Sequence, residues 1–282
     1  MARRFIHSEP ASRLAIWARR TAGFALLASF LAIIIVRSGL LEIWPALATF
    51  AGALTIAVVA LLVAFAAFVV IWMEGLAGMG AALTAMAVSL ALLAYPAYLG
   101  LKASRLPWIY DITTDPIDPP RYDALSRLRP RDANPVTYSG LYAAEQQRKA
   151  YPDVGPLATN ATPQAAYDAA LAVVNKRRWR VVDARAPQAG RREGHIEAVA
   201  RTPIMGFRDD VSIRVRAETD GARIDARSSS RYGSFDFGAN ASRVRGLMNE
   251  IEDAIRAQRP ERPPAQPTAK KSTPGKKDQS KK

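Results

Sequence analysis

The feature that most restricts how this chain can fold is an N-terminal segment almost without charge. Residues 21–101 contain only three charged side chains, Arg37, Glu42 and Glu74. A soluble domain needs a charged surface, whereas a membrane-spanning helix needs about 20 apolar residues in succession. The segment therefore predicts three membrane helices, at about 21–41, 47–72 and 76–99. The first has the shortest apolar run because Arg37 interrupts it, so two crossings are the alternative.

The arginines around the first span predict its orientation. Arg13, Arg19 and Arg20 precede it, and only Arg37 follows it. Positive side chains stay on the cytoplasmic side, so residues 1–20 are expected to form a cytoplasmic basic arm. Three crossings then place the rest of the chain in the periplasm, anchored to a bacterial inner membrane. Two crossings would keep it on the cytoplasmic side.

Charge is distributed unevenly along the chain. The net charge is +14, and the two ends, 1–20 and 259–282, carry ten of these excess positive charges. The residues between them are close to balanced, which argues against nucleic acid as a partner. The chain has no cysteine, which excludes a disulfide framework, a thiolate zinc site and a cysteine nucleophile. We expect no cofactor and no metal site.

The C-terminal segment 259–282 is rich in proline and lysine. This composition predicts a disordered basic tail. Its paired lysines would be attracted to anionic membrane lipid, or the tail is simply solvated and has no partner.

Residues 102–258 predict a soluble part in two sections. Residues 102–160 are rich in proline and aspartate and predict an extended arm. Residues 161–258 predict the domain core, which opens with Thr162 as N-cap and Pro163 as first helical residue. Four strands are expected at 179–186, 194–201, 210–218 and 222–230, and a last helix at 241–257. The expected fold is a two-layer α+β domain, a four-stranded antiparallel sheet covered by two helices.

The last two strands predict a hairpin, because Asp220-Gly221 is a preferred two-residue turn. That turn would pair Glu218 with Arg223 and Arg216 with Asp225, but it would also set Arg214 opposite Arg227. Like charges directly opposite are destabilising, so an acidic group should lie between them. The candidates are an internal carboxylate, from Glu197, Asp209, Asp210 or Asp236, and a bound anion. The third possibility is that the strands pair in a different register.

Several segments resemble a known family. They are Asp111–Pro120, Tyr151-Pro152, Gly206–Arg214, and Arg227–Gly233 with Asp236–Arg243. Together they are similar to the bacterial and plastid family called domain of unknown function 1499, over about 107–256. The resemblance implies a membrane-associated or exported protein of undetermined activity and supplies no catalytic residues.

Polar residues are densest around the turn from the last strand into the last helix. A helix N-terminus binds anions, and arginines add bidentate contacts. The predicted anion ligands are Arg214, Arg227, Ser229, Arg231 and Asn240, and the predicted ion-pair partners are Asp209, Asp210 and Asp236. In the alternative, these acids pair with the arginines and Asn240 caps the helix.

Two further motifs have structural explanations. Asp111, Asp115 and Asp118 lack the glycine and glutamate of a calcium loop, so turn chemistry is favoured. His195 could serve a hydrolytic serine among 228–230, but no nucleophile-elbow glycines surround them.

The functional prediction is a binding or accessory module at the membrane, and catalysis is not favoured. The expected partners are membrane lipid and either an anionic envelope component or another membrane protein. The alternatives are an envelope-directed hydrolase and a structural partner of a membrane protein.

Overall fold

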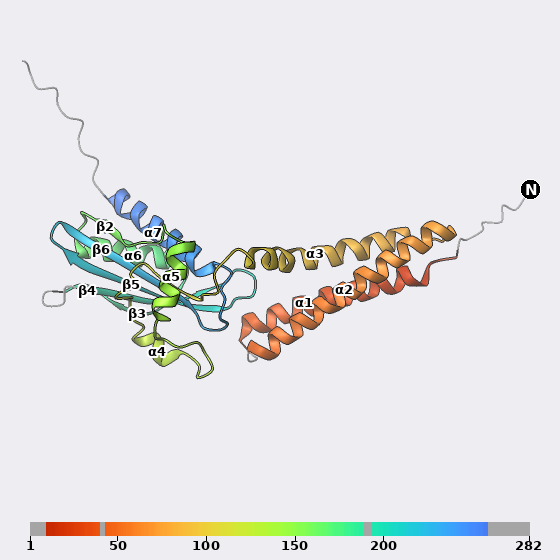
Figure 1. The fold of residues 1–282 in the computed structure, drawn as a ribbon, viewed down its shortest axis with the longest axis horizontal. Coiled ribbons are helices and arrows are strands. Elements are labelled where there is room, and N and C mark those ends of the chain that lie inside the picture. Colours follow the sequence, from red (N-terminus) through yellow and green to blue (C-terminus); the bar gives the residue numbers. More distant parts are fainter. Residues whose placement is uncertain (1–9, 40–42, 189–192, 259–282) are drawn as a thin grey trace, which may run out of the picture.

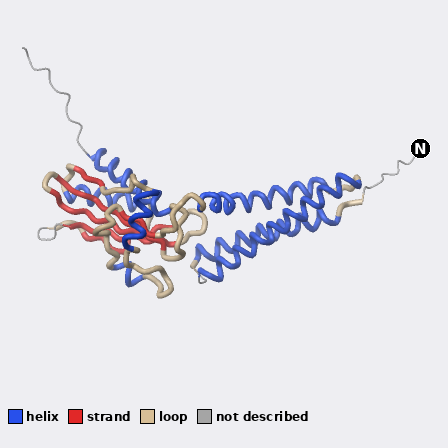
Figure 2. The backbone as a smooth tube through the Cα atoms, viewed as in Figure 1, coloured by secondary structure: helices blue, strands red, loops and turns tan. Residues whose placement is uncertain are grey.

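The structure is a computed structural model that describes residues 10–39, 43–188 and 193–258. The first nine residues of the predicted basic arm and the predicted tail 259–282 lie outside the described residues. The described part consists of an elongated helical bundle and an α+β domain at one end of it (Figures 1 and 2).

The bundle contains α1 (Arg13–Ser38), α2 (Ile43–Glu74) and α3 (Met79–Ala103), each long and apolar enough to cross a membrane. This confirms the prediction of three long apolar helices. Helix α1 begins before the apolar segment, because the side chain of Ser12 accepts a hydrogen bond from the backbone N–H of Ala15 and caps the helix.

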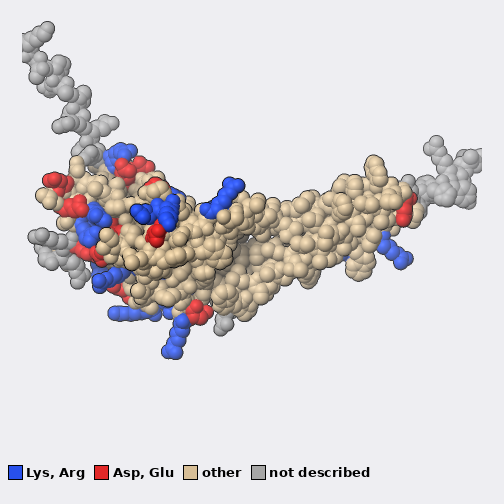
Figure 3. All heavy atoms as spheres, in the orientation of Figure 1, with Lys and Arg blue, Asp and Glu red and all other residues tan. Residues whose placement is uncertain are grey.

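Small side chains fill the seams between the three helices. Among the described residues of the bundle, the buried hydrophobic ones are all alanine except Ile71. Alanine lets helix backbones approach closely, and this packing drives association where lipid surrounds the helices. Larger side chains such as Phe24, Leu62 and Trp72 point outward, and Figure 3 shows a bundle surface almost without charge.

Within the residues that the structure describes, the domain contains one antiparallel sheet of six strands, not the four expected. The strands are β1 (Asp111–Thr113), β2 (Leu157–Thr159), β3 (Arg180–Arg185), β4 (Glu193–Arg201), β5 (Arg208–Glu218) and β6 (Gly221–Ser230). The order is β1-β6-β5-β4-β3, and β2 also pairs with β6. The two additional strands come from the predicted arm. Each has three residues, too few for a visible alternation of apolar and polar side chains.

Helices α6 (Pro163–Lys176) and α7 (Ala239–Gln258) cover one face of the sheet, as expected. Their apolar side chains meet Ile196, Ile213 and Ile224 in the core. The arm also contains α4 (Ala124–Leu128) and α5 (Gly140–Ala150). Tyr122 and Leu125 pack against Val199 on the second face. The predicted two-layer arrangement is therefore incomplete, because the arm covers the face opposite the two helices.

The β5–β6 hairpin has a different register from the one expected. Glu218 pairs with Gly221, so Thr219 and Asp220 form the turn. Gly221 belongs to the strand because it lies against β2, where a Cβ atom would overlap the carbonyl oxygen of Thr159. The expected pairing of Arg214 with Arg227 is therefore wrong, as are those of Glu218 and Arg216.

The observed partners on this hairpin resolve the expected clash of charges. Arg214 lies opposite Asp225, and Arg227 lies opposite Ser212. The register differs from the expected one by two residues. Side chains alternate between faces with a period of two, so every side chain keeps the face that was expected for it.

The domain and the start of α1 lie at opposite ends of the bundle (Figure 1). At the far end, the N–H of Ser12 donates to the carbonyl of Ala77 at 2.8 Å. At the near end, Nη1 of Arg37 donates to the carbonyls of Pro203 at 2.6 Å and Ile204 at 2.9 Å. Arg37 thus joins the end of α1 to the β4–β5 loop.

Candidate functional site

The second face of the sheet, which we call the arm-covered face, carries the polar side chains of β4, β5 and β6. Alternation places Glu197, Asp210, Arg214, Asp225 and Arg227 on this face, and all of them are buried. Buried charges need partners. The arm supplies most of these partners.

The pair of Arg227 and Asp111 is almost inaccessible to solvent. Nε and Nη2 of Arg227 donate to the two carboxylate oxygens of Asp111, at 2.9 and 2.6 Å. Nη2 also donates to the carbonyl of Val136 at 2.9 Å, and the guanidinium lies 4.6 Å from the ring centre of Tyr122. Burial raises the pKa of Asp111, and the hydrogen bonds and charge of Arg227 oppose this shift. An external anion would have to displace Asp111 to reach Arg227.

Asp210 is held between two arginines. Nε of Arg129 donates to one of its oxygens at 2.6 Å, and Nε and Nη2 of Arg231 donate to the other at 2.9 and 2.7 Å. Arg129 also donates to the hydroxyl of Ser229 at 3.2 Å. The arm therefore closes over Asp210 through Arg129.

Three arginines and three aspartates form a third group on the arm-covered face, toward the β5–β6 turn. Arg214 donates to the side chain of Asp118 at 2.9 Å and to the backbone carbonyl of Asp118 at 2.7 Å. Its Nη2 also lies 3.3 Å from Asp225. The remaining members, which share these carboxylates, are Arg216, Arg223 and Asp115. The acid expected near Arg214 and Arg227 thus comes from the arm and from Asp225, none of which was among the four residues proposed for it.

Asn240, Asp209 and Asp236 lie on the helix-covered side instead. Asn240 accepts from the hydroxyl of Ser228 at 2.8 Å and donates to the carbonyl of Tyr110 at 2.9 Å. Asp236 accepts from the N–H groups of Gly238 and Asn240, both at 2.8 Å, and so caps the start of α7. Asp209 pairs with Arg243.

The predicted constellation is therefore split by the sheet. Asp209 and Asp210 are adjacent in β5 and point to opposite faces. Asn240 lies on one side of the sheet, and Arg214, Arg227, Ser229 and Arg231 lie on the other. The structure does not bring the five predicted ligands together around one open site.

Comparison with known proteins identifies a family whose matched region contains the ion pairs described above. A family model described as a protein of unknown function (DUF1499) matches residues 111–251. The chain belongs to this family. The DUF1499 region begins at Asp111, the partner of Arg227, and ends at Ile251, a buried residue of α7. No curated protein matches the chain.

A group of possible metal ligands within the DUF1499 region is Asp123, His195 and Glu197. The oxygens of Glu197 accept hydrogen bonds from the N–H groups of Asp123, Ala124 and Leu125, at 2.8, 3.1 and 2.7 Å. Nε2 of His195 lies 3.0 Å from the same carboxylate. With three backbone N–H donors around it, Glu197 is suited to capping α4 and holding the arm, and these N–H groups would repel a cation.

The end of the DUF1499 domain that faces the bundle carries a different kind of charge. Arg201 and Arg208 lie opposite each other on β4 and β5, and Arg180 starts the next strand, β3. All three are exposed. Among the described residues none of the three has a carboxylate within salt-bridge distance. We call Arg180, Arg201 and Arg208 the arginine cluster.

The arginine cluster surrounds a groove of about 220 Å³, which Arg178 and Trp179 also line. Partial burial lowers the pKa of Arg208, and the positive charges of Arg201, Arg231 and Arg180 lower it further. An anion bound here would relieve this repulsion. Sequence reasoning missed the cluster because its members lie on three strands, and only their pairing brings them together.

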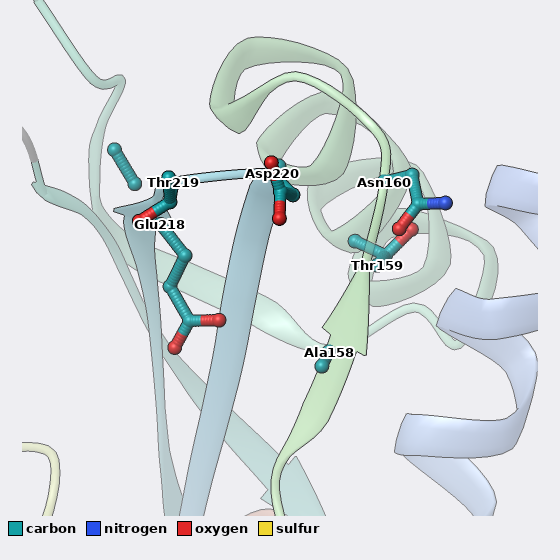
Figure 4. A pocket seen from close by; sticks show the side chains of 8 residues that line it. Ala158, Thr159, Asn160, Glu218, Thr219 and Asp220 are labelled. Atoms are coloured by element: carbon teal, nitrogen blue, oxygen red, sulfur yellow. The ribbon is translucent and has the colours of Figure 1, made fainter.

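A second pocket lies at the opposite tip of the domain, at the β5–β6 turn (Figure 4). Glu218 and Asp220 line one side of it, and Ala158, Thr159 and Asn160, from β2 and the residue after it, line the other. Most of these residues are exposed. Among the described residues that line this pocket there is no cation, so it does not suit the expected anionic ligand.

Proposed function

We propose that this chain is a binding module anchored in the bacterial inner membrane, with its DUF1499 domain in the periplasm. Its ligand is an anionic envelope component, bound at the bundle-facing end of the domain. The arginine cluster carries this proposal, because it combines three exposed positive charges with no carboxylate partner among the described residues. The buried arginines of the arm-covered face, by contrast, have aspartate partners.

In this proposal the ligands expected from the sequence mainly hold the domain together. They are Arg214, Arg227, Ser229, Arg231 and Asn240. Each has an internal hydrogen-bond partner, and an anion would have to compete with Asp111, Asp118 or Asp210 for three of them. Arg231 is the member whose charge acts on Arg208. We therefore assign the first contact to the arginine cluster, with Arg231 behind it.

The compartment can be tested with reporter fusions. The reporters would be attached after residue 258, in place of the tail. Alkaline phosphatase, which folds only in an oxidising compartment, should be active there, and a cytosolic fluorescent reporter should be dark. A silent phosphatase with a bright reporter would return the domain to the cytoplasm.

Anion binding can be tested on the full chain in detergent micelles. Inorganic phosphate should raise the midpoint of thermal unfolding of the wild type, because a ligand that binds only the folded state stabilises it. The double variant R201Q/R208Q should lose this shift. The matched variant R148Q/R256Q, which removes two exposed arginines from α5 and α7, should keep it. If phosphate raised the midpoint equally in all three proteins, the arginine cluster would not be the binding site.

The alternative of an envelope-directed hydrolase finds no support in the described pockets. His195 and the serines at 228–230 line none of the three. A structural role beside another membrane protein would use the outward-facing side chains of the bundle. Capture by the bundle alone, without the domain, would favour that role over ours.

A further inference from the structure

A pocket of about 720 Å³ lies where the domain meets the bundle. We call it the junction pocket. Its bundle side consists of Val36 and Gly39 at the end of α1 and Ile43 and Trp44 at the start of α2. On the domain side it is lined by Phe207, Arg208, Arg231, Tyr232, Gly206, Pro130 and Asp132.

The two sides of the junction pocket differ in chemistry. Val36, Ile43 and Trp44 offer apolar surface that belongs to the membrane-spanning helices. Arg208 and Arg231 offer positive charge, and Arg208 continues into the arginine cluster. A ligand that fills this pocket should therefore be amphiphilic, with an anionic group on the domain side and an apolar part toward the helices.

Aromatic side chains indicate that this pocket lies at the level of the bilayer surface. Tryptophan is enriched where the hydrocarbon meets the headgroups. Trp44 is 59% exposed at the start of α2, and Trp108 is 66% exposed just beyond α3. The ring of Trp108 stacks on that of Phe235 with 5.2 Å between the ring centres, and the ring centres of Phe235 and Phe237 are 4.5 Å apart. These rings belong to the end of the domain that faces the bundle.

We propose that the junction pocket binds an anionic phospholipid of the surrounding bilayer. The lipid phosphate contacts Arg208, and the upper part of its acyl chains lies against Val36 and Trp44. This inference rests on the proposed function and names the ligand class of the same end of the domain. Asp132 also lines the pocket, and its charge keeps the phosphate on the side of Arg208.

The test uses the full chain in nanodiscs that contain phosphatidylglycerol and phosphatidylcholine in equal amounts. Native mass spectrometry of the released protein then counts the lipids that stay bound. The wild type should retain phosphatidylglycerol over phosphatidylcholine by at least about fivefold, since each arginine near a membrane surface adds to the attraction for anionic lipid. The preference should weaken as salt is added.

Variants identify the residues responsible. R180Q/R201Q/R208Q should lower the preference to near one, whereas R127Q/R148Q/R256Q, with the same loss of charge, should retain it. The single variant R208K keeps the charge and should keep most of the preference, which shows that the pocket remains folded. A wild-type protein without preference, or a triple variant that retains it, would overturn the lipid assignment.

The experiment with inorganic phosphate shows whether the lipid inference alone is wrong or the proposed function is wrong as well. If phosphate stabilises the wild type but not R201Q/R208Q, while neither lipid is preferred, the end of the domain binds a soluble anion. The proposed function then stands and the lipid inference is wrong. If phosphate has no effect and phosphatidylglycerol is still preferred, the lipid inference stands and phosphate is not itself a ligand of the arginine cluster.

Discussion

On the arm-covered face, buried charges are paired, and the two partners of a pair come from segments that are far apart in the chain. Arg227 and Asp111 are separated by 116 residues, and both side chains are almost inaccessible to solvent. Removing one partner of a buried pair leaves the other charge uncompensated, at a cost of about 3–5 kcal/mol. The Arg–Asp pairs therefore hold the arm against the sheet.

Substitution of Asp111 by Asn tests this role. We expect D111N to lower the free energy of unfolding by about 3 kcal/mol, because Arg227 loses its negative partner in a buried site. The measurement is the unfolding midpoint of the full chain in micelles. D253N removes an exposed carboxylate from α7 and should change stability by less than about 0.5 kcal/mol. Equal behaviour of the two variants would contradict the structural role.

The pH dependence of stability should follow Glu197 and Asp115. Burial acts to raise the pKa of Glu197, but the hydrogen bonds from His195 and from the start of α4 outweigh it and lower the pKa. The pKa of Asp115 is also lowered, because the N–H of Asp118 and the charge of Arg223 outweigh its partial burial.

A carboxyl group with a lowered folded pKa stabilises the fold above its unfolded pKa, which is about 4. That stabilisation disappears as the pH falls through the folded pKa. We therefore expect the contribution of Glu197 and Asp115 to stability to be lost below about pH 4, while the raised pKa values of Asp111, Asp209 and Asp236 act in the opposite direction. The variant E197Q should be less stable at pH 7 and should show a shallower drop in its thermal midpoint. The same change of midpoint between pH 7 and 3 in the wild type and in E197Q would contradict this assignment.

From the sequence one could predict that certain arginines need an acidic partner, but not which residue that partner is. The residues showed that Arg214 and Arg227 need negative charge, but not that Asp111 and Asp118 provide it. Which carboxylate of a proline-rich arm reaches a given arginine depends on the path of the arm across the sheet, and local propensities do not encode that path.

At the level of elements, β6 depends on a glycine. Gly221 has φ of 145°, and its backbone lies against β2. A strained backbone alone costs about 1–3 kcal/mol. We expect G221A to destabilise the domain by more than this, because the added Cβ would also overlap the backbone of Thr159. The control G155A has open space for its Cβ. Chemical unfolding compares the two, and similar midpoints would contradict the observed register.

The same hairpin shows what sequence patterns resolve at this level. Alternation predicted the faces of β5 and β6 correctly, because it depends only on odd and even positions. The choice of turn residues was wrong, because a contact with β2 determines where Gly221 lies. Strands β1 and β2 were missed for a related reason: each exists only because the free edge of β6 is available for pairing.

On the scale of the whole molecule, charge separates along the long axis. The hairpin tip carries Glu218 and Asp220, and the opposite end of the domain carries the arginine cluster. The surface of the bundle is nearly without charge (Figure 3). The three apolar helices could be predicted from composition alone. The position of the arginine cluster next to the bundle required the tertiary structure.

The absence of cysteine permits a direct test of the arrangement. In intact cells with a permeable outer membrane, T219C should react with a membrane-impermeant maleimide, because the residue is exposed at the domain tip. A11C, at the other end of the bundle, should react only after lysis. Labelling of both residues from one side would contradict three crossings, and the reverse pattern would place the domain in the cytoplasm.

The contact between Arg37 and the β4–β5 loop also has a mechanical consequence. Two carbonyl groups of that loop accept hydrogen bonds from one guanidinium at the end of a stiff helix. Tilting of α1, as happens when a bilayer thins or thickens, would pull directly on the loop between Arg201 and Arg208. The groove beside these arginines would then widen or narrow with the thickness of the membrane.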